Sequence, residues 1–524
     1  MAEPTADDLA VIIPTRERWD ILARTLASLS NQTVSGFETI VVVDGTDQDP
    51  PPLEATTVLV KRRAGPAAAR NAGARATTRE IVMYLGDDTI PASDLVERHL
   101  AAHRRHPESQ AAVVGFVDWH DSVAANRINS WLDWSGTQFW FSSLARDGEQ
   151  EVSHWHFYTS NVSLKRELLL EGGGFDEDFP FAAFEDIECA LRLSHLGLRL
   201  YYEPGAVCHH LHGYDWPGLE RRFASMALSE RLMVEMHPDV APGCLNRMKE
   251  ATTRPALPLE RWADVVPARM KRLGALVRHQ ANRHYHRRLA PTYLAAWDRA
   301  AELCELRRYL DEGFDSARLV YGSERPGDAA PSRSGPDGED RDEARLFDLA
   351  REALTGSAGE ALTLLERHLP PRSKVLDFGC GIGTVGLGLA GSGHAARFAD
   401  QPGPPLDYLR WRLAERGARL PVYALGVDAL PADSDAAVCL EASGPGRDPV
   451  GILRQLEELA PTVVLGLDAG PDGGGRQSES PAPDTGTSRV VDRQVLAGGR
   501  LLLFYRRTGE PSPSRSAPLP SPGR

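Results

Sequence analysis

The sequence predicts an α/β protein with two separate sheet-containing halves. Apolar runs that end in polar residues alternate with helical patterns over residues 9–85, and the same alternation returns over 374–440. Such alternation is typical of parallel, doubly wound sheets, in which a helix connects each strand to the next. A helical stretch and then a segment rich in Pro, Gly, Ser and charge separate the halves. The predicted parts are an α/β domain (1–216), a helical extension (217–321), a flexible linker (322–343), a Rossmann-like domain (344–507) and a disordered tail (508–524).

Length and composition indicate an ordinary globular protein of more than one domain. A chain of 524 residues is too long for a single core. It contains no run of about 18 uncharged apolar residues, and its first residues are acidic rather than a basic and then apolar leader. The six cysteines have no paired spacing, which argues against a disulfide framework and against a zinc site. We therefore expect a cytoplasmic protein without a transmembrane segment.

The net charge of −14 disfavours a nucleic-acid partner, but the charge is unevenly distributed. Residues 247–288 contain eleven Arg or Lys and three acids. One interpretation is a solvated helical surface. The other is peripheral docking of this segment to an acidic acceptor or to an anionic membrane surface.

The N-terminal half begins with a regular succession of strands and helices. The expected strands are 9–15, 38–44, 58–60 and 81–85, and the expected helices are 18–30 and 66–76. Because parallel strands end at the same edge of a sheet, the polar residues after three of these strands should meet there. Three polar strand ends at one edge predict a binding site.

Two adjacent carboxylates, Asp87 and Asp88, end the buried strand at 81–85. Adjacent acids repel each other, and a divalent cation such as Mg²⁺ or Mn²⁺ neutralises them through oxygen ligands. The alternative is a polar turn that caps the strand before Pro91. The surroundings argue against an NAD-binding or P-loop ATP-binding enzyme, because the first strand ends in Pro14, Thr15 and Arg16 rather than in a glycine-rich or Walker loop.

Four segments of this half, 11–16, 42–46, 65–73 and 85–91, resemble the family 2 glycosyltransferases of GT-A fold. The resemblance implies a nucleotide-sugar donor, with UDP the expected nucleotide, and a Mg²⁺ or Mn²⁺ ion that Asp88 holds on the diphosphate. It implies seven residues that bind the nucleotide-sugar, with Asp44 reading the base: Pro14, Thr15, Arg16, Asp44, Arg70, Asn71 and Asp87. The chain departs from the family pattern at Val43 and Gly86, where the family has further acids.

The acceptor side of the same resemblance lies in segments 160–166, 172–176 and 184–193. Glu185 and Asp186 fall in the first turn of a predicted helix, where acids also stabilise the helix dipole without any catalytic role. The resemblance implies that this pair is catalytic and that Asp186 is the general base, which removes the proton of the acceptor hydroxyl. In-line attack of this kind inverts the anomeric centre.

Two further features complete the expected site. His209, in a cluster with His210 and His212, follows the last strand, where the family often has a histidine ligand to the metal; a surface loop is the competing account. Residues 119–158 hold five of the ten tryptophans. Their aromatic faces suit either the selection of a sugar-like acceptor or a second core.

The C-terminal half shows a strand that runs into a glycine loop at 374–383, followed by a strand at 395–400 that ends in an acid. Glycines at such a turn let the backbone approach a nucleotide-like ligand, and the acid is placed to bind ribose hydroxyls. The half resembles class I S-adenosylmethionine-dependent methyltransferases over 345–507. That resemblance implies six cofactor-binding residues: Asp377, Gly379, Gly381, Gly383, Asp400 and Asp428.

The departures in this half leave an alternative open. Glu441 and Ala442 replace the usual acid and histidine, and 468–484 reads as an insertion. A degenerate domain that binds only the cofactor or only its partner domain is the alternative to an active one.

The combined expectation is an inverting glycosyltransferase that acts on a hydroxyl of a glycan or natural product, followed by methyl transfer to the same product. Two alternatives belong to other classes of protein. One is a carbohydrate-binding scaffold on an inactive transferase fold, and the other is a methyltransferase whose first domain only recruits a glycan.

Overall fold

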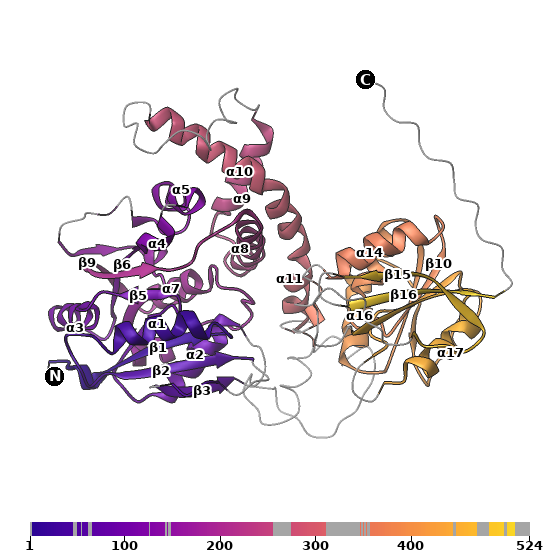
Figure 1. The fold of residues 1–524 in the computed structure, drawn as a ribbon, viewed down its shortest axis with the longest axis horizontal. Helices are drawn as coiled ribbons and strands as arrows, with labels where there is room; N and C mark the ends of the chain where they lie inside the picture. Colours follow the sequence, from indigo (N-terminus) through magenta and orange to yellow (C-terminus); the bar gives the residue numbers. More distant parts are fainter. Residues whose placement is uncertain are drawn as a thin grey trace. The chain divides into compact units, whose positions relative to one another are not determined.

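The computed structural model forms two compact units, Met1–Ala301 and Glu302–Arg524 (Figure 1). The structure describes residues 3–45, 50–53, 55–60, 65–124, 126–141, 144, 148–254, 274–310, 346, 349–350, 353, 357–443, 447–468, 482–496 and 500–508. The predicted linker at 322–343 and all but the first residue of the predicted tail lie outside the described residues, as does part of the basic segment at 247–288.

The first unit is built on one sheet, in which the strands follow the order β3-β2-β1-β4-β8-β6-β9-β5 and β7 pairs with β9. Its strands are β1 (Leu9–Thr15), β2 (Glu38–Asp44), β3 (Thr56–Val60), β4 (Ile81–Leu85), β5 (Thr89–Pro91), β6 (Ala111–Trp119), β7 (Gln150–Val152), β8 (Asn161–Lys165) and β9 (Arg199–His210). Its helices are η1 (Ala6–Asp8), α1 (Trp19–Leu29), α2 (Pro66–Ala76), α3 (Leu95–Arg105), α4 (Asp121–Ala124), α5 (Arg127–Ser135), η3 (His154–His156), α6 (Arg166–Glu171), α7 (Glu185–His195), α8 (Trp216–Met236), α9 (Gly243–Thr253) and α10 (Gly274–Arg299).

The direction of the strands confirms the expected parallel part of the sheet. β1, β2, β3 and β4 are parallel, as predicted. Beyond these four strands the sheet contains antiparallel pairs, since β8 runs antiparallel to both β4 and β6. Leu85 pairs with Asn161, so β8 begins at the edge where β4 ends and runs back across the sheet. The sheet is therefore mixed.

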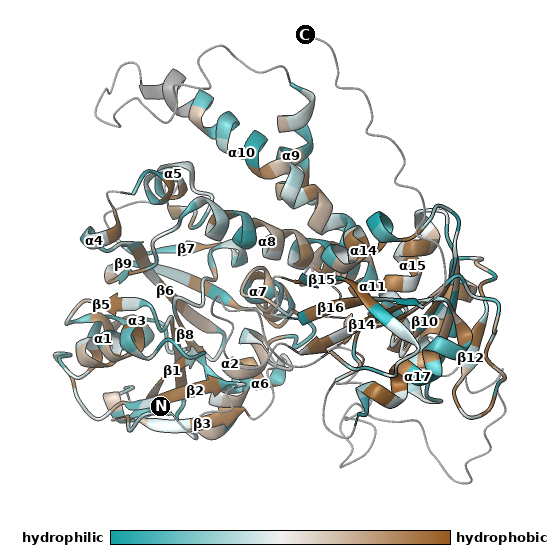
Figure 2. Cartoon of the chain, turned by 45° about the vertical axis from the view of Figure 1, so that its right-hand side comes forward, coloured by the Kyte–Doolittle hydropathy of each residue, from teal (hydrophilic) through white to brown (hydrophobic). Residues whose placement is uncertain are grey.

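Small residues bring α2 close to the strands that it covers. The helix packs on β1 and β2 (Figure 1). A Cβ atom on Gly73 would lie 2.4 Å from Ile12 Cγ2, so only glycine fits there. The strands beneath are largely buried and mostly hydrophobic (Figure 2), and residues 9–13 of β1 and 81–85 of β4 have no exposed surface. This packing fixes the face of α2 that carries Arg70.

The described part of the predicted helical extension is helical up to the end of the first unit. α10 packs on α8 and α9 and also contacts α5. The indole of Trp131 stacks on the ring of Tyr285 at 4.3 Å, and its N–H donates to Asn282 Oδ1 at 3.0 Å. Trp131 is 1% exposed, so it belongs to a second core rather than to an acceptor surface.

Among the described residues, no helix combines the length and the apolar character needed to cross a membrane.

The second unit contains a sheet of order β12-β11-β10-β13-β14-β16-β15, which is parallel from β12 to β14 and antiparallel at β16. Its strands are β10 (Lys374–Phe378), β11 (Ala395–Asp400), β12 (Val422–Ala424), β13 (Ala436–Cys439), β14 (Thr462–Asp468), β15 (Ser488–Val495) and β16 (Arg500–Arg507). Its helices are α11 (Ala301–Arg308), α14 (Ser357–His368), α15 (Thr384–Gly391), α16 (Pro404–Glu415) and α17 (Pro449–Leu459). The fully buried Arg412 ties α11 into this unit through Glu302 and Glu305.

Candidate functional site

The order of the strands marks the place where a ligand should bind in the first unit. β2 and β3 lie on one side of β1 and β4 lies on the other, so the sequence order reverses between β1 and β4. Open α/β sheets bind ligands outside the carboxyl ends of the strands at such a point. There the Thr15 hydroxyl, after β1, donates to Asp87 Oδ2 at 2.7 Å, and the Thr25 hydroxyl donates to the Asp87 carbonyl at 2.8 Å. A side-chain hydrogen bond thus joins the end of β1 to the residues that follow β4.

Arg18 neutralises both acids at this edge. Its Nε donates to Asp87 Oδ2 at 3.0 Å and its Nη1 donates to Asp88 Oδ2 at 2.8 Å. Burial and the charge of Asp88 raise the pKa of Asp87 to about 6. Burial opposes ionisation of Asp88 too, but His210, Arg18 and His212 hold its pKa below the ordinary value. Arg18 was not among the predicted site residues, although its position just before α1, at the same edge, was a usable signal.

Two histidines of the cluster, His210 and His212, lie beside Asp88. His210 Nε2 lies 3.3 Å from Asp88 Oδ1, and His212 Nδ1 lies 3.8 Å from Asp88 Oδ2. The structure places His209 against Asp118 instead. Neighbouring residues of a strand point to opposite faces, so His209 and His210 cannot both face Asp88. Burial lowers the pKa of both His210 and His212, which favours neutral imidazoles, the form that binds a metal.

The residues around Asp88 fit a cation that is shared with a bound diphosphate. In the described part of the chain, no group of three or more His, Cys, Asp or Glu is arranged to hold a metal alone. Asp88 offers one carboxylate with two imidazoles beside it. Mg²⁺ is commonly held by one or two carboxylates together with substrate phosphates, and imidazole also suits Mn²⁺. The donor set matches that arrangement rather than an all-protein cage.

Asp44 lies at the end of β2 beside the start of α2. Its Oδ2 accepts a hydrogen bond from the backbone N–H of Gly65 at 3.1 Å, and Gly65 has a φ of +93° that favours glycine. Asp44 is 8% exposed. Pro14 is partly exposed and Arg16 is exposed at the neighbouring end of β1. The structure therefore brings these predicted nucleotide-binding residues to one edge of the sheet.

Arg70 and Glu185 form a buried ion pair across the site. Arg70 Nη1 donates to Glu185 Oε1 at 2.7 Å, and the guanidinium lies 5.5 Å from the ring centre of Phe175. Both residues are less than a tenth exposed. Arg70 Nε and Glu185 Oε2 have no hydrogen-bond partner within the described structure, which is unusual for buried polar atoms. The pair connects α2 with the first turn of α7.

Asn71 fixes the loop that precedes α7. Its side chain donates to the Phe175 carbonyl at 2.8 Å and accepts from the Phe175 N–H at 2.9 Å. It also donates to Glu177 Oε1 at 2.8 Å. A Cβ atom on Gly174, which has a φ of +75°, would lie 2.5 Å from Asn71 Oδ1. In this structure the amide of Asn71 is thus engaged by the loop, not held ready for a nucleotide.

Asp186 has the ionisation behaviour of a general base. Its Oδ1 accepts the backbone N–H of Ile187 at 2.9 Å. Burial of the carboxyl group, together with the charge of Glu185, raises the pKa of Asp186 to about 7. Thr159 also donates a backbone hydrogen bond to Asp186 and precedes β8, whose Asn161 pairs with Leu85 at the end of β4. Asp186 therefore stands at the same sheet edge as Asp88.

Aromatic rings lie between the acid pair and the surroundings of Asp186. The ring of Phe139 lies 5.4 Å from that of Tyr158 and 6.1 Å from that of His210. Burial raises the pKa of the Tyr158 phenol, and the charge of the nearby Asp186 adds to this increase. Trp140 is 53% exposed and stacks on His156 at 5.7 Å. The aromatic segment thus contributes both to a core, through Trp131, and to the surroundings of the site.

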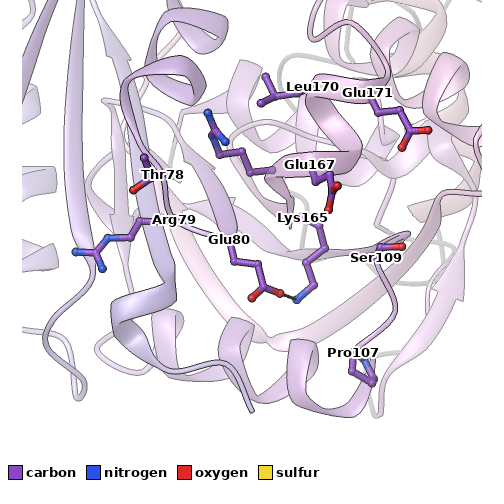
Figure 3. Close-up of a pocket in the computed structure, with 10 residues that line it drawn as sticks. Thr78, Arg79, Glu80, Pro107, Ser109, Lys165, Glu167, Leu170 and Glu171 are labelled. Atoms are coloured by element: carbon purple, nitrogen blue, oxygen red, sulfur yellow. Dashed lines mark hydrogen bonds and ion pairs between the residues drawn. The ribbon is translucent and has the colours of Figure 1, made fainter. Parts of the chain in front are cut away.

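A large cavity of about 880 Å³ lies at the opposite end of the sheet, where β4 begins and β8 ends (Figure 3). Its basic side chains hold the fold: Lys165 Nζ contacts Glu80 Oε1 at 2.9 Å, and Arg166 Nε donates to the Ala74 carbonyl at 2.8 Å. None of the predicted site residues lines it. The cavity is therefore separate from the candidate site.

The second unit has its own switch point at β10, which lies between β11 and β13. A pocket of about 120 Å³ is found there, and its lining includes Asp377, Gly379, Gly381 and Asp400. Asp400 Oδ2 accepts the N–H of Gly381 at 2.6 Å. The carboxyl of Asp377 accepts the N–H of Gly386 at 2.9 Å, and burial raises the pKa of Asp377 to about 7.

The two other predicted cofactor-binding residues serve the fold in this structure. A Cβ atom on Gly383 would lie 2.4 Å from Leu409 Cδ1, so glycine is required there by packing. Asp428 Oδ2 accepts the backbone N–H of Ala424 at 2.7 Å. The described lining of the pocket includes neither residue.

Comparison with known proteins supports the glycosyltransferase resemblance of the first unit. Residues 10–171 match the family described as Glycosyl transferase family 2. Validoxylamine A glucosyltransferase of Streptomyces hygroscopicus subsp. jinggangensis is 28% identical over 276 residues, which cover 45% of this chain and 62% of that protein. Pre-mycofactocin glycosyltransferase of Mycobacterium tuberculosis is 27% identical over 253 residues, which cover 45% of this chain and 49% of that protein. The chain thus spans less than two thirds of the length of these relatives.

Among solved structures, the mannosyltransferase PcManGT from Pyrobaculum calidifontis in complex with GDP-Man and Mn²⁺ is similar at 20% identity. The match covers 60% of this chain and 79% of that one, with a TM-score of 0.32.

Proposed function

We propose that the first unit is an inverting glycosyltransferase that moves a sugar from a nucleoside-diphosphate donor, with UDP the expected nucleotide, to a hydroxyl of a natural product or glycan. The observation that carries the proposal is the meeting of two groups at one sheet edge. One is the buried pair Asp87–Asp88, and the other is Asp186, whose pKa is raised to about 7. The family match over 10–171 and the relatives named as glycosyltransferases support it.

Each side of the site has its own task. Asp44 and Arg16 face the nucleotide, while Asp88 holds a Mg²⁺ or Mn²⁺ ion on the diphosphate. We place His210 and His212 beside that ion, in place of the expected His209. When bound, the ion screens the diphosphate and stabilises the leaving group.

Asp186 performs the proton transfer. Its carboxylate accepts the proton of the acceptor hydroxyl, whose oxygen attacks the anomeric carbon while the bond from that carbon to the diphosphate oxygen breaks. Attack from the side opposite the leaving group inverts the anomeric centre. A pKa near 7 suits a base that works at neutral pH. Glu185, which is paired with Arg70, acts as a positioning residue that raises the pKa of Asp186.

Calorimetric titration with UDP tests the first-unit proposal. We expect Mn²⁺ to strengthen UDP binding by at least about tenfold, because the ion screens charge between the diphosphate and Asp88. GDP and dTDP serve as competing nucleotides that report base selection by Asp44. Failure of all three nucleotides to bind, with or without Mn²⁺, would contradict the proposal and favour a scaffold on an inactive fold.

We also propose that the second unit binds S-adenosylmethionine and methylates the product of the first. Support comes from the pocket at the switch point, where Asp377, Gly379, Gly381 and Asp400 meet. Its volume of about 120 Å³ is smaller than ligand pockets of about 300–1,000 Å³, so a whole cofactor requires the lining to move apart. A degenerate domain and a methyltransferase with a glycan-recruiting first unit are the alternatives.

Titration with S-adenosylmethionine separates these accounts. We expect the wild-type protein to bind it and Asp400→Asn to bind at least about tenfold more weakly, because ribose hydroxyls lose a charged acceptor. The amide oxygen of Asn can still accept the Gly381 N–H, so the loop should keep its shape. Glu415→Gln, an exposed change on α16, is the matched control. Absence of binding to the wild-type protein would favour the degenerate domain, and methyl transfer without sugar transfer would favour the recruiting first unit.

A further inference from the structure

Arg18 occupies a position that the proposed reaction leaves unexplained. Its guanidinium lies across the acid pair with one edge on Asp87 and one N–H on Asp88 Oδ2, at 2.8 Å. The side chains of Asp87 and Asp88 are 2% and 9% exposed, whereas that of Arg18 is 41% exposed. The acids are therefore held rigidly inside the fold, and the partner that neutralises them can move.

Arg18 and a divalent cation compete for the same carboxylate. Asp88 offers two oxygens, and His210 and His212 flank one each at 3.3 and 3.8 Å. The oxygen beside His212 already accepts the Arg18 N–H. A cation that binds between the carboxylate and the imidazoles would lie close to the guanidinium, and two positive charges at that distance repel each other strongly in a partly buried site. A cation held by both oxygens of Asp88 would therefore displace the Arg18 N–H from Oδ2.

A diphosphate offers the displaced guanidinium a new partner. Arginine presents a planar fork of donors that matches phosphate oxygens in pairs. Because the guanidinium is planar, Nη1 can leave Asp88 only if the whole group swings outward, and the Arg18 side chain, which is 41% exposed, has room for this movement. Asp87 then keeps the hydrogen bond from the Thr15 hydroxyl. With the diphosphate present, the cation gains Asp88 and the guanidinium gains phosphate, so neither charge is left unpaired.

We propose that Arg18 is an internal counter-ion that couples cation binding to nucleoside-diphosphate binding, so that the site takes up the metal efficiently only together with the diphosphate. The inference rests on the proposed function of the first unit. Because coupling between two ligands is reciprocal, the diphosphate should raise the affinity for the cation by the same factor by which the cation raises the affinity for the diphosphate.

The experiment measures Mn²⁺ affinity by calorimetry or by the electron paramagnetic resonance signal of free Mn²⁺, without and with saturating UDP. The proteins are wild type, Arg18→Gln, Arg18→Lys and the control Arg24→Gln, which changes an exposed arginine on α1, the helix that Arg18 precedes. We expect Arg18→Gln to bind Mn²⁺ without UDP at least about fivefold more tightly than wild type, and the enhancement by UDP to fall by a similar factor. Arg18→Lys should lie between the two, because lysine keeps the charge without the fork. Arg24→Gln should match wild type.

The outcomes separate this inference from the function on which it rests. If wild type binds UDP with Mn²⁺ but both Arg18 variants keep the wild-type coupling factor, Arg18 is not the counter-ion and the transferase proposal stands. If Mn²⁺ binds more weakly to both variants without UDP, the inference is overturned in the same way, since Arg18 would then be supporting the metal site. If wild type binds no nucleotide under any condition, the proposed function fails and the inference fails with it. Melting curves establish that each variant is folded before its affinity is compared.

Discussion

Replacing Asp186 with asparagine is expected to slow sugar transfer by about 10²–10⁴-fold, the usual contribution of a general base. Asparagine has nearly the same shape and can still accept the N–H of Ile187, but it cannot take a proton from the acceptor hydroxyl. Nucleotide binding should be unchanged, because the Asp87–Asp88 pair and Arg18 are untouched. Steady-state rates of donor consumption and calorimetric titration with UDP measure the two quantities.

The pH dependence of sugar transfer by the wild-type enzyme should report the ionisation of Asp186. Only the ionised form of Asp186 can act as a base, so kcat/KM is expected to rise with pH and to level off above about 7. This rise should be missing from the residual activity of Asp186→Asn.

The raised pKa of Asp186 also predicts the pH dependence of stability. Activity should rise with pH, whereas the contribution of Asp186 to the stability of the folded protein should fall. The pKa of Asp186 is higher in the folded protein than the ordinary 3.8, so the folded state holds the proton more tightly than the unfolded chain does. The resulting stabilisation is complete below pH of about 4 and is lost as the pH rises through about 7. Asn does not ionise, so the variant should melt at a higher temperature than wild type at pH 8, with the difference shrinking toward pH 4.

Glu171→Gln is the control for these measurements, since it removes an exposed carboxylate beside the separate cavity at the opposite end of the sheet. It should leave the rate, the pH profile and the melting temperature unchanged. An Asp186→Asn variant that keeps wild-type activity would show that another group is the base, and would leave Asp186 with the alternative role of stabilising the start of α7.

The elements of the parallel half were predictable almost to the residue. The expected strands 9–15, 38–44 and 81–85 and the helix 66–76 coincide with β1, β2, β4 and α2. Strands buried on both faces are continuous apolar runs, and each of these ends at a polar residue or glycine, so their bounds are visible in the sequence. Strand direction is not visible in this way, because an apolar run looks the same in either direction. The antiparallel β8 therefore required the structure.

The candidate site was predictable from the sequence where an acidic residue follows closely on a strand or lies in the first turn of a helix. Asp88 and Asp186 stood out for this reason, and the structure places both at one sheet edge. The choice between His209 and His210 depends on which face of β9 is turned toward Asp88, and three histidines within four residues do not determine a face. Arg18 was missed because its partners are about seventy residues away along the chain.

Replacing Asp88 with asparagine is expected to abolish the effect of Mn²⁺ on UDP binding and to reduce sugar transfer by at least about 100-fold. Even the outer partners of metal ligands typically contribute about 10–100-fold to metal affinity or activity, and a carboxylate that binds the ion directly should contribute more. Asn keeps the shape of Asp88 and an oxygen that can accept the Arg18 N–H, so the fold should survive. Calorimetric titration with UDP, with and without Mn²⁺, measures the first effect, and donor consumption measures the second.

Asp118→Asn is the informative comparison, because Asp118 is a second carboxylate paired with a histidine of the same cluster, His209, on the neighbouring strand. If His210 and His212 accompany the metal, Asp118→Asn should keep the Mn²⁺ effect that Asp88→Asn loses. Loss of the Mn²⁺ effect in both variants would indicate that His209, which is paired with Asp118, belongs to the metal site. Retention of both the Mn²⁺ effect and activity in Asp88→Asn would instead show that the cation binds elsewhere and that the acid pair, neutralised by Arg18, serves the fold.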